Sequence, residues 1–220
     1  QPWKLKYVAY GNEWWFYNQA DQYADAYKKH MYYTKNYTDS PMFRILRGGH
    51  RYHYHFTDQL VQRVEPGTFD ALTLYHVAYA PGGYTQGRQT DFTPDEYYFT
   101  IQNALDIDQA IQRHVGILRT KDGNQHVKLA IDEWGTWYDA TWDKDNSDGF
   151  WSMITTMRDA MVAGIVLNIY NQHSDVVERA SLCMSVNALH SILLTKGEKM
   201  IKCPTYFIMK MYRPHQDATL

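Results

Sequence analysis

With 220 residues, of which 45% are hydrophobic, the chain is long enough for one sizeable domain with a buried core. Its formal net charge of −2 provides no basic field, which argues against nucleic acid or an acidic membrane surface as a partner. Cys183 and Cys203 are too few for a disulfide framework and lack a Cys-x-x-Cys spacing, so both are expected to be reduced and buried.

No run of about 18 apolar residues occurs, and the amino terminus lacks a basic patch followed by an apolar segment. Neither a transmembrane helix nor a signal peptide is therefore visible, and we expect a cytoplasmic protein that does not bind a membrane. Because a strand-like run follows within a few residues of Gln1, the alternative stays open that a native amino terminus with a targeting signal precedes it.

Five short apolar runs predict β-strands, because polar or turn-forming residues bound each of them. Their centres lie near Val8, Ile45, Leu72, Leu129 and Val166, at intervals of 27 to 57 residues. Such intervals leave room for a crossover helix between successive strands, and strands joined in this way form a parallel sheet. The predicted fold class is therefore α/β.

Helical periodicity is clearest in two of the intervening segments. Apolar residues over positions 20–31 recur every three or four residues. A second helix is predicted to start at Thr93, because Thr93 can cap it, Pro94 suits its first turn and Glu96 can complete a capping box. An apolar face continues over residues 101–118 until a Lys-Asp-Gly-Asn turn ends the helix.

Two segments are predicted to be loops. Residues 79–88 are rich in Gly and Pro, and a long loop after a barrel strand is either a place of substrate contacts or a plain surface excursion. His50, His53 and His55 follow the second strand, where three imidazoles could ligate zinc. Their spacing matches neither one helix face nor a known zinc pattern, so we expect a polar loop and no metal site.

Two glutamates, Glu13 and Glu133, each stand where a strand-like run stops. Parallel barrels build their active sites from side chains at the carboxyl ends of their strands. Two carboxyl groups placed there are the minimum for cleaving a glycosidic bond, one as proton donor and the other as nucleophile or base. The alternative is that both are exposed glutamates that cap helices or form salt bridges.

A series of short motifs accompanies these glutamates through almost the whole chain. The most specific is Asp-Glu-Trp-Gly at 132–135, whereas Asn-Glu at 12–13 is common to many related glycosidases. The motifs lie at 11–13, 132–139, 158–160, 167–171, 204–206 and 215–217. In order and in sequence they resemble glycoside hydrolase family 51, whose members are chiefly α-L-arabinofuranosidases.

The resemblance implies a retaining enzyme that removes terminal α-L-arabinofuranosyl residues from plant oligosaccharides or polysaccharides such as arabinan and arabinoxylan. Glu13 would be the acid/base that holds its proton near neutrality, and Glu133 the ionised nucleophile. Asn12 would hydrogen-bond the sugar hydroxyl beside the anomeric carbon. Trp137 would line the sugar pocket, with core packing as the alternative, whereas Trp134 is expected to pack in the core. No metal or organic cofactor is expected, and the complete protein is expected to be a homo-oligomer.

Three positions depart from the family pattern. Tyr75 and His76, the expected substrate-binding residues at the end of the third strand, stand in reversed order, which turns the imidazole to the opposite face of the strand. Met184 stands where a glutamine is common. Residues 14–18 replace a glycine-rich loop, whose backbone path they cannot follow cheaply.

Under the resemblance, the five predicted strands correspond to strands four to eight of a TIM (β/α)8 barrel. The chain is then a single, incomplete catalytic domain over residues 1–220, without the first three strands and without the β-sandwich domain that follows the barrel. Two alternatives stay open. One is another member of the same clan, such as a xylosidase or endoglucanase, and the other is a catalytically incompetent fragment or remnant that only binds carbohydrate.

Overall fold

The computed structural model of the protein describes residues 4–14, 19–36, 39–83, 86–139 and 152–218. The chain divides into two compact units. The first unit comprises Gln1–Tyr75, Gln109–Asp132 and His173–Ala180, and the second comprises His76–Asp108, Glu133–Gln172 and Ser181–Leu220.

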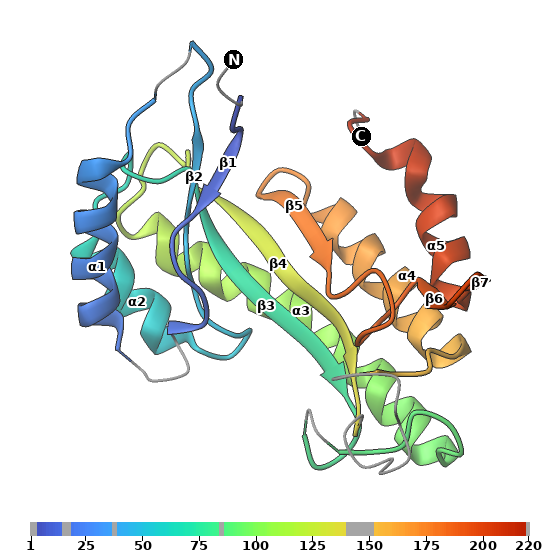
Figure 1. The fold of residues 1–220 in the computed structure, drawn as a ribbon. Coiled ribbons are helices and arrows are strands. Elements are labelled where there is room, and N and C mark those ends of the chain that lie inside the picture. The colour runs from blue at the N-terminus through green and yellow to red at the C-terminus, as the bar shows by residue number, and fades with distance from the viewer. Residues whose placement is uncertain (1–3, 15–18, 37–38, 84–85, 140–151, 219–220) are drawn as a thin grey trace. The chain divides into compact units, whose positions relative to one another are not determined.

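Five strands form one sheet in the order β1-β2-β3-β4-β5, and the registers of β1 with β2 and of β2 with β3 are parallel (Figure 1). These strands are β1 (Tyr7–Ala9), β2 (Phe43–Leu46), β3 (Ala71–Tyr79), β4 (Lys128–Trp137) and β5 (Val177–Leu182). A separate antiparallel hairpin consists of β6 (Leu193–Lys196) and β7 (Lys199–Lys202). The helices are α1 (Ala20–Tyr33), α2 (Tyr54–Arg63), α3 (Pro94–Arg119), α4 (Met157–Gln172) and α5 (Pro204–Tyr212), followed by the 3₁₀ helix η2 (Arg213–His215).

Helix α1 confirms the periodicity predicted for positions 20–31, and two tyrosines attach it to the start of the sheet. Tyr23 and Tyr27 are buried, and the Tyr27 ring meets the Tyr10 ring edge-on at 5.2 Å. The Tyr23 hydroxyl donates to the Tyr10 carbonyl at 2.7 Å and accepts from the Arg47 backbone N–H at 2.7 Å. Burial raises the pKa of both tyrosines, so both phenols stay neutral. Helix α1 thereby fixes the segments that follow β1 and β2.

Helix α3 begins with the capping box that the sequence predicts. The Thr93 hydroxyl accepts a hydrogen bond from the Glu96 N–H at 3.2 Å, and the Glu96 carboxylate accepts one from the Thr93 N–H at 2.7 Å. Two otherwise unpaired donors of the first turn are satisfied in this way. Pro94 occupies the first position of the helix, where its missing N–H costs nothing.

The prediction of a strand around Val166 is wrong, because this residue lies in helix α4. Buried positions of α4 include Val162, Val166 and Tyr170, which recur every four residues along one helix face. The fifth strand is instead β5, a more polar segment. A short apolar run does not distinguish a buried strand from a buried helix, and here the apolar run belongs to the helix.

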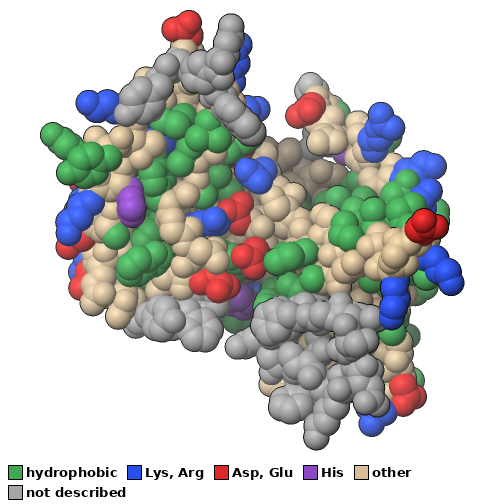
Figure 2. Space-filling view, in the orientation of Figure 1, with side chains coloured by type: hydrophobic (Ala, Val, Ile, Leu, Met, Phe, Trp, Pro, Cys, Tyr) green, Lys and Arg blue, Asp and Glu red, His purple; other side chains and the backbone are tan. Residues whose placement is uncertain are grey.

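The surface carries charges of both signs. On the face drawn in Figure 2, acidic and basic side chains are interspersed over most of the described residues. Hydrophobic side chains come to the surface beside α5 and the β6–β7 hairpin, with Lys and Arg around them. None of the helices within the described ranges is both long and apolar enough to cross a lipid bilayer.

Candidate active site

The residues predicted for the site come from β3, β4 and the segment after β1, and they are divided between the two units. The first unit contains Asn12, Glu13 and Tyr75, and the second contains His76, Glu133 and Trp137. Strand β4 continues to Trp137, so the expectation that Glu133 closes its strand is wrong. The small Gly135 and the polar Thr136 hide this extension from a reading by hydrophobicity alone.

The backbone turns sharply on leaving β1. Glu13 has a φ of 49°, in the left-handed region that residues with a side chain seldom adopt. Gly11 has a φ of 82°, and a Cβ atom at this position would lie 2.7 Å from the indole nitrogen of Trp14. Backbone strain of this kind is often found where a side chain must be aimed for function. The turn presents Asn12 and Glu13 directly after the strand.

Arg47 connects the residues of the first unit, and the sequence analysis missed it. Its Nε donates to the Gly11 carbonyl at 2.8 Å, and its Nη1 donates to the Tyr75 hydroxyl at 3.4 Å. The Tyr75 hydroxyl in turn donates to the Asn12 side-chain carbonyl at 3.0 Å. Arg47 directly follows the strand Phe43–Leu46, so the reasoning that selected Glu13 would also have found it.

The guanidinium of Arg47 is balanced by Asp132, with which it forms a short ion pair. The side chains of these two residues are only 15% and 12% exposed, so the pair is largely shielded from water. Arg179 approaches the other oxygen of Asp132 at 3.9 Å and stacks over the Tyr7 ring at 5.0 Å. Asp132 therefore lies between two cations, directly before Glu133 in the sequence.

In the second unit, the Cys183 thiol contacts the Glu133 side chain. The sulfur lies 3.8 Å from Oε2 of Glu133, within the range of a weak S–H donor. Both cysteines are free, as expected, and Cys203 is buried. Cys183 is only partly buried, so the expectation that both are buried is wrong for this residue. A thiol that donates to a carboxylate favours its ionised form, which is the form a nucleophile needs.

His190 fixes the part of β4 that follows Glu133. The Thr136 N–H donates to His190 Nδ1 at 3.0 Å, so the imidazole proton resides on Nε2 and is donated to the Thr205 hydroxyl at 2.8 Å. Complete burial lowers the pKa of His190 and keeps the ring neutral. Gly135, with a φ of 143°, leaves no room for a side chain, because a Cβ atom there would lie 2.8 Å from the His190 Cβ.

Asp159 ties the same strand end to helix α4. Its Oδ1 accepts from the Thr136 hydroxyl at 2.5 Å, and its Oδ2 accepts from the Thr156 N–H at 2.6 Å. The Thr156 hydroxyl accepts from the Arg158 N–H at 3.2 Å, which completes a cap at the start of α4. The motifs at 158–160 and 204–206 thus meet around Thr136, where they support the strand that carries Glu133.

Arg158 anchors the Gly- and Pro-rich loop that follows β3. Its guanidinium lies between the rings of Phe92 and Tyr138, 3.8 Å from each centroid, and its Nη2 donates to the Arg88 carbonyl at 2.7 Å. Gln89 adds a hydrogen bond to the Asp139 carbonyl at 3.1 Å. This part of the loop is therefore held against the end of β4, and its role in substrate contact stays a prediction.

The remaining predicted residues differ in their surroundings. Tyr75 is buried with its hydroxyl on Asn12, whereas His76, the next residue of β3, is completely buried in the second unit. Trp134 packs in the core against Tyr170 and His190, as expected. Trp137 is half-buried against a cluster formed by Ala80, Tyr138, Met153 and Leu189. The roles of Tyr75, His76 and Trp137 in sugar binding stay predictions.

Of the histidines after β2, His50 and His53 are half-buried and close to the buried His114, whereas His55 is exposed. The rings of His50 and His53 lie 5.9 Å apart, and His114 of α3 receives a hydrogen bond from Thr57 at 3.0 Å and donates to the Arg51 carbonyl at 3.1 Å. Burial, with Arg51 nearby, lowers the pKa of His50 to about 3, and burial lowers that of His114 to about 4. Within the described ranges, no group of three or more His, Cys, Asp or Glu residues is arranged to hold a metal ion.

The buried His114 predicts a loss of stability in mild acid. An unfolded histidine binds a proton below about pH 6.5, but native His114 does not until about pH 4. Between these two pH values the unfolded state thus binds more protons than the native state. As the pH is lowered through this window, His114 should therefore reduce the free energy of unfolding by about 1.4 kcal/mol per pH unit. Urea titrations at pH 7 and pH 5 should show a smaller difference for His114→Gln than for the native protein. His126→Gln, at an exposed position, is the control, and an unchanged pH dependence in His114→Gln would contradict the assignment.

Comparison with known proteins agrees with this arrangement. A family model described as the alpha-L-arabinofuranosidase C-terminal domain matches residues 132–220. An intracellular exo-alpha-L-arabinofuranosidase of Bacteroides ovatus is 35% identical over 222 residues, which cover 100% of this chain and 43% of the relative. The crystal structure of a GH51 arabinofuranosidase from Xanthomonas axonopodis pv. citri matches 99% of this chain and 44% of its own, with a TM-score of 0.92 and 30% identity. Over its whole length the chain is similar to arabinofuranosidases of glycoside hydrolase family 51.

A more distant family 51 α-L-arabinofuranosidase, from Bifidobacterium longum, shares the fold, with a TM-score of 0.74 over 94% of this chain at 17% identity. The predicted α/β fold, a part of a TIM barrel that corresponds to strands four to eight, is confirmed apart from the misplaced fifth strand. The chain described here spans less than half the length of the Bacteroides and Xanthomonas relatives.

Proposed function

We propose that this chain carries catalytic residues of a retaining exo-acting α-L-arabinofuranosidase of glycoside hydrolase family 51. The observation behind this proposal is the hydrogen-bonded group of the first unit, in which Arg47 and Tyr75 hold Asn12 directly before Glu13. An amide held beside a carboxyl group is suited to recognise a sugar hydroxyl next to the bond that is cut. The names of the relatives point to terminal α-L-arabinofuranosyl residues as the group removed.

In the proposed reaction, the carboxylate of Glu133 attacks the anomeric carbon while Glu13 gives its proton to the departing glycosidic oxygen. The bond to that oxygen breaks, and a covalent glycosyl ester of Glu133 remains. Glu13 then takes a proton from water, whose oxygen attacks the anomeric carbon. The bond from that carbon to the Glu133 carboxylate breaks, and arabinose is released with its original anomeric configuration. Trp137 would bound the sugar on one side. The mechanism needs no metal or organic cofactor.

A catalytically incompetent protein that only binds carbohydrate is the second candidate. The observation in its favour is the reversed order of Tyr75 and His76, which leaves the imidazole completely buried. Met184, in place of a glutamine, is 53% exposed and offers only a weak thioether acceptor. Within the described residues no feature favours a xylosidase or endoglucanase instead.

The same proposal extends to the cellular compartment of the protein, to the barrel strands outside residues 1–220 and to its oligomeric state. The Bacteroides relative is named as intracellular, and we place this protein in the cytoplasm. Its partner would be an arabinose-containing oligosaccharide or polysaccharide. We further propose that residues outside 1–220 supply the first three barrel strands and the β-sandwich domain, and that the complete protein is a homo-oligomer.

A panel of nitrophenyl glycosides tests the function. Assayed in a longer version that includes the upstream strands, the protein should hydrolyse the α-L-arabinofuranoside and release arabinose with retained configuration. Residues 1–220 alone should be inactive and self-associate, because β1 and β5 are the edges of the sheet and unpaired edges template association. Preference for a xyloside would contradict the proposed substrate, and an active monomer of 220 residues would contradict the proposed completeness.

Arg47→Met should lower kcat/KM about 10- to 100-fold, because the Gly11 carbonyl and the Tyr75 hydroxyl that holds Asn12 lose their common donor. A small misplacement of reacting groups is costly. Arg47→Lys should recover only part of the activity, since one ammonium cannot reproduce the planar fork of donors. The assay uses a nitrophenyl arabinofuranoside at a temperature where circular dichroism shows each variant folded. Arg63→Met on the exposed side of α2 is the control, and an unchanged kcat/KM in Arg47→Met would contradict a positioning role.

A further inference from the structure

A row of stacked side chains runs from the end of β4 to the start of α3, and the proposed catalysis does not use it. The Arg158 guanidinium lies 3.8 Å from the centroid of the Tyr138 ring and 3.8 Å from that of Phe92. Phe92 stacks on Tyr97 at 6.2 Å, with the two rings inclined by 26°. Tyr98 meets Tyr97 edge-on at 5.3 Å. These five side chains form the aromatic row, and all of them belong to the second unit.

The aromatic row leads from the core to the surface. Tyr138 is completely buried and Arg158 is 1% exposed, whereas Tyr98 is 69% exposed. Phe92 and Tyr97 between them are half-buried. Single exposed aromatic side chains are common on protein surfaces, but Tyr98 is held by the packed side chains of the row. Because the ring is already held in place, little conformational freedom is lost when a ligand covers it. The exposed end of the row is therefore a preorganised flat surface.

The exposed end of the row lies on the side of the sheet where the proposed active site is. The N–H of Tyr79, at the end of β3, donates to the Asn103 side chain of α3 at 3.1 Å. The turns of α3 before Asn103, which carry Tyr98, therefore extend beyond the carboxyl end of β3 (Figure 1). Barrel enzymes bind their substrates on this side. At its buried end, the row includes Tyr138, which directly follows Trp137, the tryptophan proposed to line the sugar pocket.

The charges near the exposed end indicate what class of ligand fits it. Asp95, which is exposed, and Glu96 stand in the same helical turn as Tyr98. Arg88 forms an ion pair with Asp91 at 2.8 Å, so it adds no net positive charge. This turn repels an acidic polymer. An uncharged sugar ring fits it, because the C–H groups of the sugar cover an aromatic face while its hydroxyls stay in water.

We propose that Tyr98, at the exposed end of the aromatic row, binds the main chain of a neutral polysaccharide while an arabinosyl side chain of that polymer occupies the active site; the choice of a carbohydrate rests on the proposed function. The C–H face of a main-chain sugar contacts the Tyr98 ring, and the phenol hydroxyl exchanges hydrogen bonds with sugar hydroxyls. A substrate too short to reach Tyr98 gains nothing from it. The row therefore favours polymers over small glycosides.

Affinity electrophoresis in gels that contain soluble arabinoxylan tests this proposal without reference to catalysis. The protein is the longer version that includes the upstream strands. Tyr98→Ala should raise the dissociation constant for arabinoxylan about tenfold, the effect expected when a tyrosine at the centre of a contact is truncated. Tyr98→Trp should restore binding, because an indole also presents a flat ring face.

Kinetics provide a second measurement that a general loss of folding does not mimic. In Tyr98→Ala, the ratio of kcat/KM for arabinoxylan to kcat/KM for a nitrophenyl arabinofuranoside should fall about tenfold, because only the polymer reaches Tyr98. The loss should lie in KM for the polymer, since the contact is the same in the ground state and in the transition state.

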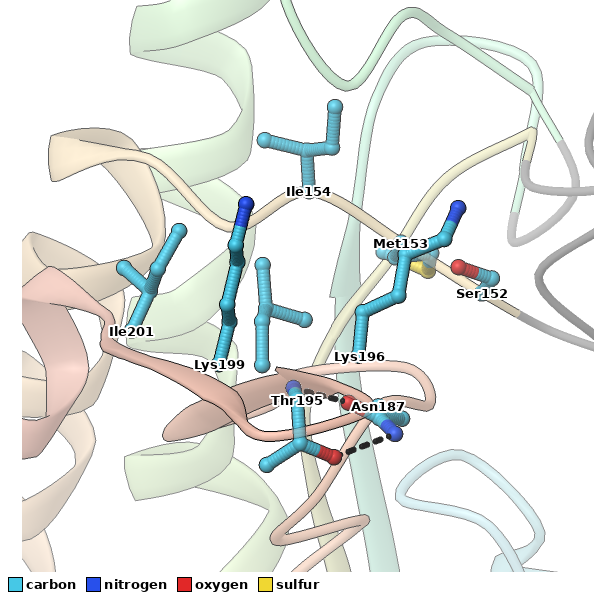
Figure 3. Close-up of a pocket in the computed structure, with 9 residues that line it drawn as sticks. Ser152, Met153, Ile154, Asn187, Thr195, Lys196, Lys199 and Ile201 are labelled. Atoms are coloured by element: carbon cyan, nitrogen blue, oxygen red, sulfur yellow. Dashed lines mark hydrogen bonds between the residues drawn. The ribbon is translucent and has the colours of Figure 1, made fainter.

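Tyr32→Ala is the matched control. Tyr32 is 76% exposed and meets Tyr33 edge-on at 5.2 Å, but it lies in the last turn of α1, which leads back to the amino end of β2. Ile201→Ala is a second control, because Ile201 is 64% exposed at the separate pocket drawn in Figure 3 and has no ring. Both variants should bind arabinoxylan as the native protein does.

Unchanged binding of arabinoxylan by Tyr98→Ala, or an equal loss in Tyr32→Ala or Ile201→Ala, would overturn the proposal. So would binding of the acidic polymer polygalacturonate as tightly as arabinoxylan. A change of oligomeric state in Tyr98→Ala, measured by size-exclusion chromatography, would assign the ring to an interface between copies instead. If arabinoxylan binds through Tyr98 but no arabinofuranoside is hydrolysed, the proposed activity fails and the binding site stands.

Discussion

Glu133→Ala should lower the turnover of every substrate by at least about a thousandfold, because no covalent glycosyl-enzyme can form without the carboxylate. Such a loss corresponds to about 4 kcal/mol of transition-state stabilisation, which is within the range of covalent catalysis. The damage should not depend on the leaving group, since the attack on the anomeric carbon is common to all substrates. Rates with nitrophenyl arabinofuranosides and with an arabinose-substituted oligosaccharide are the measurement.

Azide provides the discriminating test for this variant. In Glu133→Ala the anion can enter the space left by the side chain and attack the anomeric carbon, so activity should return with an arabinosyl azide of inverted configuration as product. Glu178→Gln, at an exposed position of β5, is the control and should retain full activity. A loss of less than about tenfold in Glu133→Ala would sink the assignment of the nucleophile.

Glu13→Ala should damage catalysis in a way that depends on the leaving group. A nitrophenolate departs without a proton, so its arabinofuranoside should still form the glycosyl-enzyme, whereas natural glycosides, which need protonation, should react about 100- to 10,000-fold more slowly. Steady-state rates across a series of aryl leaving groups are the measurement.

Glu65→Gln, at an exposed position after α2, is the control for this substitution. Equal loss of activity toward nitrophenyl and oligosaccharide substrates in Glu13→Ala would contradict the acid/base role. It would instead assign to Glu13 a part in holding the turn after β1, where its backbone is in the left-handed region.

Local chemistry in the sequence was sufficient for several elements. The capping box of Thr93 and Glu96 forms as predicted, because all of its partners lie within four residues of one another. The spacing of the buried residues in α1 could also be predicted from the sequence, because residues three or four positions apart lie on the same face of a helix. Around Val166 the same reasoning failed, because a helix and a strand that are both buried present the same continuous apolar run.

By itself, the sequence determined the α/β class, four of the five strands, the two candidate catalytic glutamates and the resemblance to family 51. These features depend on hydrophobic periodicity, on the spacing of strand-like runs and on short motifs, all of which are local properties of the sequence. Only the tertiary structure decided that Arg47, from the end of β2, holds Gly11 and Tyr75 and pairs with Asp132. It also decided that Asp159 and His190 meet at Thr136. The physical reason is that such hydrogen bonds join residues 23 to 85 positions apart, and the geometry of a side-chain bond over that separation is set by how the elements pack.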